Sequence, residues 1–124
     1  MEATEPPFDP RAGRRMKPRD AARWTRRYRD TPRLPGDKPT LAHYFGKEFL
    51  QGLLAEPNCA GLRIYQAIDD SGARRVVLIG VDDQGKDLLP PVKEDGTLPD
   101  NGDGVGETPM TCPSICDPNS PLMQ

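Results

Sequence analysis

The placement of proline sets the strongest limit on what this chain can fold into. Of the fifteen prolines in 124 residues, only Pro57 lies between Thr40 and Leu89. Because proline lacks a backbone N–H and disrupts the interior of helices and sheets, we expect regular structure mainly in that interval. The hydrophobic content is only 35%, and sparse apolar surface cannot offset the entropy of ordering every residue. The sequence therefore predicts a core at residues 40–89 between an N-terminal arm and linker (residues 1–39) and a Pro/Gly-rich tail (residues 90–124).

The predicted core begins with an amphipathic segment. Apolar side chains recur at three- and four-residue spacing from Leu41 to Leu54, which is the pattern of a helix with one apolar face. Thr40 can cap the first turn, and Pro57 ends the segment. The spacing predicts a helix over residues 41–55.

Two strands are expected after this helix. Residues 61–68 alternate in polarity, residues 75–81 are β-branched and aliphatic, and the turn residues 69–72 join them. A third short strand could begin at Leu88-Leu89. The predicted fold class is α+β, with one amphipathic helix packed on a β-hairpin and long irregular extensions. Because a two-stranded sheet is marginal alone, its outer edge could accept a partner strand. The side chains expected to build this scaffold are Phe45, Phe49, Leu53, Ile64, Val77 and Ile79.

The two extensions carry opposite charge. Between Arg11 and Arg33, nine arginines and one lysine accompany two aspartates, for a net charge of +8. From Asp82 onward, nine acidic residues accompany two lysines, for a net charge of −7. Such blocks are typical of interaction tails, so the two ends are expected to attract each other or the ends of another copy.

Within the arm, Asp20 could cap a short helix over residues 21–29. Trp24 and Tyr28 would then share one face among arginines, and a helix this short needs a surface on which to dock. A protein partner or a second copy is the favoured interpretation. Nucleic acid is an alternative, because arginines bind phosphates and aromatic rings stack on bases; docking on an acidic protein surface, this chain's own tail included, is another. The candidate partner-binding residues are Arg23, Trp24, Arg26, Arg27 and Tyr28.

Cys112 and Cys116 form the most reactive-looking motif, with C-x3-C spacing rather than the C-x2-C of zinc sites. A zinc ion would need Cys59 and the single histidine, His43, as further ligands, and we predict no metal. A disulfide that locks the tail and a pair of free thiols both remain open. An odd number of cysteines fits a reducing compartment. With no secretory signal pattern and no membrane-length apolar run, we expect a cytoplasmic protein without membrane insertion.

The sequence favours no enzymatic chemistry. Its paired aspartates fall in turns, and residues 100–104 lack the alternating register of a calcium-binding loop. The glycines at 102–106 have no strand before them and no helix after them, as a phosphate cradle requires. A catalytic triad would have to use His43, and no nucleophile elbow is present. We therefore predict neither an enzyme nor a cofactor.

Four motifs occur in an order that resembles a family of small uncharacterised bacterial proteins. They are YFGKE (residues 44–48), GLRIY (61–65), GVDDQGKDL (80–88) and CPSIC (112–116). The resemblance covers about Leu41 to Leu122 and excludes the arm. It implies a bacterial cytoplasmic setting and assigns no functional residue, because that family has no assigned activity. The expected function is a non-enzymatic accessory or structural subunit of a larger assembly or homo-oligomer. A nucleic-acid-associated protein, or a small thiol or metal protein, is the alternative.

Overall fold

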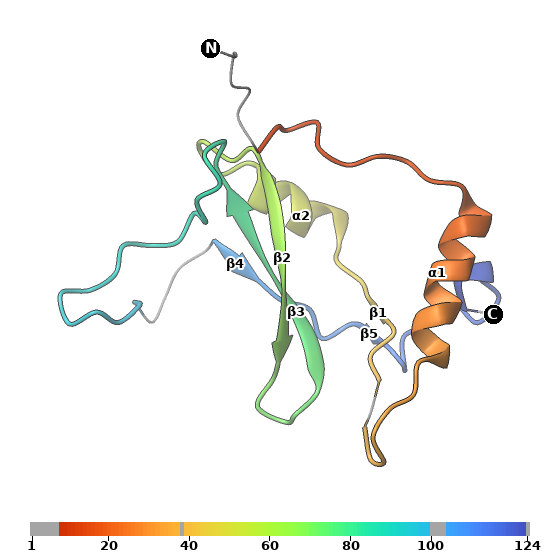
Figure 1. The fold of residues 1–124 in the computed structure, drawn as a ribbon. Coiled ribbons are helices and arrows are strands. Elements are labelled where there is room, and N and C mark those ends of the chain that lie inside the picture. Colours follow the sequence, from red (N-terminus) through yellow and green to blue (C-terminus); the bar gives the residue numbers. More distant parts are fainter. Residues whose placement is uncertain (1–7, 38, 100–103, 124) are drawn as a thin grey trace, which may run out of the picture.

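The computed structural model describes residues 8–37, 39–99 and 104–123. It confirms the α+β class, with helices and two antiparallel sheets, and α2 lies against the larger sheet while α1 stands to one side beside the C-terminal turn (Figure 1). No helix in these ranges is long and apolar enough to cross a membrane. The elements are α1 (Pro18–Asp30), β1 (Ala42–His43), α2 (Lys47–Leu54), β2 (Gly61–Ile68), β3 (Arg74–Val81), β4 (Val105–Gly106), β5 (Thr111–Cys112) and the 3-10 turn η1 (Pro121–Met123).

The predicted hairpin is confirmed as β2 and β3. The two strands pair antiparallel from Gly61 opposite Val81 to Ile68 opposite Arg74. At the turn, Gly72 has a φ of 86°, a backbone conformation that glycine adopts without steric cost. The hairpin is therefore fixed by local turn chemistry together with two strand-forming runs.

The third strand of this sheet is β4, which comes from the predicted tail rather than from Leu88-Leu89. The sheet order is β2-β3-β4, so β3 is central. Leu88 does donate its N–H to Gly80 O at 2.9 Å. However, Pro90 and Pro91 follow at once, and two consecutive residues without an N–H cannot extend a ladder.

The predicted helix over residues 41–55 is wrong in its first half. α2 begins only at Lys47, after an extended Gly46, and residues 42–43 form β1, which pairs with β5. Thr40 does not cap a helix, because its hydroxyl donates to Arg74 O at 2.9 Å. The backbone of this segment thus finds its hydrogen-bond partners in the distant tail, and the Thr40 side chain finds one in β3.

The core is small and lies between α2 and the sheet. Leu53 of α2 packs with Val76 and Leu78 of β3, each less than 10% exposed. On β4, a Cβ at Gly106 would overlap the ring of Phe49, so glycine permits the close approach of strand and helix. No large side chain in the described ranges is completely buried. The partly buried residues around this core are Phe45, Leu50 and Leu62.

Candidate functional site

The candidate site begins with α1, which starts earlier than the sequence indicated. Lys17, not Asp20, occupies the N-cap position, and Pro18 opens the first turn, where its missing N–H costs nothing. Asp20 instead lies in the first turn, where a negative charge favours the helix dipole, and pairs with Arg23 at 3.1 Å. Thr31 closes the helix by donating its hydroxyl to Arg27 O at 2.8 Å.

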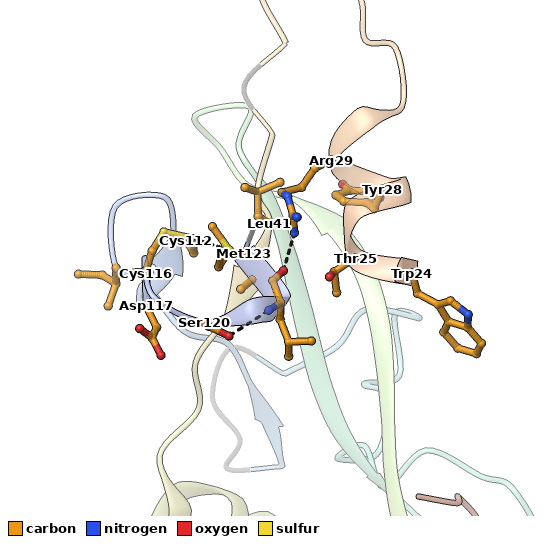
Figure 2. Close-up of a pocket in the computed structure, with 13 residues that line it drawn as sticks. Trp24, Thr25, Tyr28, Arg29, Leu41, Cys112, Cys116, Asp117, Ser120 and Met123 are labelled. Carbon is orange, nitrogen blue, oxygen red and sulfur yellow. Dashed lines mark hydrogen bonds between the residues drawn. A yellow bond between two sulfur atoms is a disulfide. The ribbon is translucent and has the colours of Figure 1, made fainter. Parts of the chain in front are cut away.

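One side of α1 docks on the chain's own C-terminal turn, η1 (Figure 1). Thr25 and Arg29 are half-buried and point towards this turn, and the Arg29 guanidinium donates to Leu122 O (Figure 2). The aromatic pair is not the docked face, since Trp24 remains 54% exposed and Tyr28 48% exposed. The arm therefore meets the tail while its two aromatic rings stay accessible.

Cys112 and Cys116 form a disulfide, with their Cα atoms 4.9 Å apart. Of the two possibilities left open by the sequence, the structure has the disulfide. Cys112 is 2% exposed on β5, whereas Cys116 is exposed. The loop is closed further by the Ile115 N–H, which donates to Thr111 O at 2.9 Å. This bridge holds the chain just before the turn on which α1 docks.

Cys59 is a free thiol, and its sulfur lies 3.2 Å from Gly61 O. Among the residues that the structure describes, no three His, Cys, Asp or Glu side chains lie close enough together to hold a metal ion. His43 neighbours the site on β1, and its pKa is lowered, first by burial and second by the positive charge of Arg75.

A pocket of about 460 Å³ lies between α1, the start of β1 and the C-terminal segment (Figure 2). It brings together the two groups that the sequence singled out separately, because Trp24, Tyr28 and both cysteines of the disulfide are among the residues that line it. The aliphatic part of this lining was not predicted to belong to a site: Leu41 was assigned to the apolar face of a helix, and Ile115, Leu122 and Met123 are single apolar residues in an otherwise polar tail.

The basic side chains are spread over the outer surface of α1. Arg23 and Arg27 are exposed, and Arg26 lines a hollow beside Pro121 on the side of the helix nearest the tail. A second groove, of about 850 Å³, is lined by the segment before α1 and by the first turns of the helix, Trp24 included. Its basic lining residues are Arg14, Arg15, Lys17 and Arg23.

Comparisons of this chain with protein-family models, with curated proteins and with solved structures gave no match. The function is therefore argued from the geometry and charge of the site itself.

Proposed function

We propose that this protein is a non-enzymatic accessory or structural subunit that binds a protein partner through α1 and the adjoining apolar pocket. One observation carries the proposal: Trp24 and Tyr28 stay about half exposed beside a preformed apolar pocket, although α1 is already docked on the tail. Tryptophan, tyrosine and arginine dominate the binding energy of protein interfaces, particularly where they border a pocket.

The charge around the aromatic pair favours an acidic partner surface. Arg23 and Arg27 are exposed on the same helix, and the arm as a whole is strongly basic. Such charges increase the association rate and select complementary partners, whereas the aromatic rings supply most of the affinity.

The test uses the full chain and paired aromatic substitutions. The partner is first captured by the tagged wild-type chain from cells of its source, then purified, and its affinity is measured by isothermal titration calorimetry. We expect Trp24→Ala and Tyr28→Ala each to weaken binding at least about tenfold, as truncation of an interface anchor does. Tyr44→Ala is the matched control, because Tyr44 is equally exposed, at 57%, but lies outside the pocket. Unchanged affinity in both arm variants, with circular dichroism of the wild type, would refute the proposal.

A second candidate, nucleic-acid binding, is favoured by the basic groove that Trp24 also lines. Arginines and a lysine along a groove contact phosphates, and an exposed indole can stack on a base. Binding of a single-stranded RNA that falls steeply with salt, and that is lost when Arg14 and Arg15 in the groove become Ala, would support this function instead of the first.

A further inference from the structure

Among the described residues, no strand pairs with the outer edge of β2. β2 lies at one side of the sheet, with β3 as its neighbour there (Figure 1). Asp69 N donates to Ala73 O across the hairpin, and Gly80 O accepts from Leu88 on the far side of β3. Because hydrogen-bonded pairs alternate along an antiparallel ladder, the even-numbered residues of β2 direct their N–H and C=O groups away from β3. These outward-facing residues are Leu62, Ile64, Gln66 and Ile68.

This edge has few of the features that keep sheet edges from pairing. Natural edges are protected by proline, bulges, short length or several charges, whereas β2 has eight residues in regular register with β3 and Arg63 as its one charged residue. Ile64 is 60% exposed and Ile68 68% exposed. Both lie on the face that carries the core residue Leu78, since Ile64 is directly opposite Leu78. In the part of the chain that the structure describes, the apolar face of the sheet therefore extends past the core to an edge that has no paired strand.

We propose that two copies of this protein pair antiparallel along β2, around a two-fold axis at Gln66. The two three-stranded sheets then form one continuous sheet. This surface is separate from the α1 pocket, so the dimer does not depend on the proposed function.

Hydrogen-bond alternation and side-chain chemistry agree on this register. With the axis at Gln66, the outward N–H and C=O of Gln66 face those of the second copy's Gln66. Ile64 then lies opposite Ile68 of the second copy, so the two most exposed apolar side chains of the strand cover one another. Arg63 and Asp69 lie opposite each other in this register, but each is already paired within its own chain, with Asp87 and Arg75 respectively, so the apolar pair carries the register.

The neighbouring register, with the axis at Ile64, fits less well. It would place Ile68 of the second copy opposite Ala60. That end of β2 is already occupied by the arm, because Phe8, Pro10 and Ala12 line a hollow with residues 60–63. The open part of the edge is therefore centred near Gln66.

Register-specific cross-linking tests the geometry directly, in a Cys59→Ser background that removes the free thiol. Gln66→Cys should give a disulfide-linked dimer on mild oxidation, because facing residues of a hydrogen-bonded pair have Cα atoms about 5.5 Å apart, within disulfide range. Ile64→Cys is the matched control on the same edge. The two introduced cysteines would lie four residues apart along the paired strands, so their Cα atoms would be about 13 Å apart at a rise of about 3.3 Å per residue. They should therefore not cross-link. Cross-linking through Ile64→Cys but not Gln66→Cys would overturn the proposed register.

Oligomeric state tests the dimer itself, by sedimentation velocity and native mass spectrometry of the full chain. Ile68→Lys should raise the dissociation constant at least about tenfold, because a lysine would face the second copy's Ile64. Leu98→Lys, at a 52% exposed position outside the sheet, should leave the dissociation constant of the dimer unchanged, and so should Trp24→Ala. A wild-type chain that stays monomeric at about 100 μM, or a dimer that survives Ile68→Lys, would overturn the proposal.

Discussion

At the scale of single residues, Asp69 shows how one side chain organises the hairpin. Its carboxylate accepts the Ser71 N–H at 2.8 Å, the Ala73 N–H at 3.0 Å and the Arg75 Nε–H at 2.9 Å. The carboxylate also accepts the Ser71 hydroxyl at 2.6 Å. Together these hydrogen bonds lower the pKa of Asp69, with the Ser71 hydroxyl as the largest cause and Arg75 next. The sequence predicted a turn role for this aspartate from the dense turn chemistry around it, and the structure confirms that role.

We expect His43 to make the stability of the fold depend on pH. Its Nδ1 is buried with no hydrogen-bond partner among the described atoms, and burial lowers its pKa below the ordinary value of 6.5. The unfolded chain therefore binds a proton below about pH 6.5 that the folded chain does not, so the free energy of unfolding should fall as the pH drops from about 7.5 to 5.5. We expect His43→Leu to reduce this dependence, because leucine cannot be protonated. Urea unfolding at both pH values measures it, and an equally steep dependence in the variant would contradict the assignment.

At the scale of elements, α2 shows where periodicity succeeds and where it fails. The three- and four-residue spacing of apolar side chains correctly identified Leu53 as a core residue, because a helical spacing places it with Leu50 against the sheet. The same apolar spacing led to a predicted helix that begins too close to the N-terminus. Gly46 adopts an extended conformation there, and the backbone beyond it gains strand partners in β5. The periodicity of a local segment carries no information about a strand partner that lies far away in the sequence.

Leu53 should carry much of the stability of the small core. We expect Leu53→Ala to lower the free energy of unfolding by about 2–5 kcal/mol, because it removes a side chain that is 3% exposed and leaves a cavity. Leu54→Ala is the matched control, since the neighbouring side chain is 47% exposed and should matter far less. Urea denaturation followed by circular dichroism measures both variants. Equal losses in the two would show that α2 does not pack as described.

At the scale of the whole molecule, the tail holds the other parts together. β4 completes the sheet beside β3, β5 pairs with β1, and η1 receives α1. Arg29 of the basic arm reaches the tail by donating a hydrogen bond to the main-chain carbonyl of Leu122. The disulfide between Cys112 and Cys116 fixes the segment between β5 and η1.

Removal of residues 119–124 should release α1 without unfolding the hairpin. A thirteen-residue helix is marginal in water on its own, so we expect its backbone amides to lose most of their protection from hydrogen exchange. The amides of β2 and β3 serve as the internal control, because their ladder lies outside the removed segment. Hydrogen-exchange mass spectrometry measures both regions. A fully protected α1 in the truncated chain would show that η1 is not its support.

The sequence by itself determined the elements whose signals are local. Alternation and turn residues predicted β2 and β3, and aromatic spacing identified the arm helix that carries Trp24 and Tyr28. Only the tertiary structure decided which distant segments meet, such as Ala42 opposite Cys112 and the arm against the C-terminal turn. The physical reason is that a two-residue strand has no periodicity to read. Its stability comes from a partner that the chain brings near only when it folds.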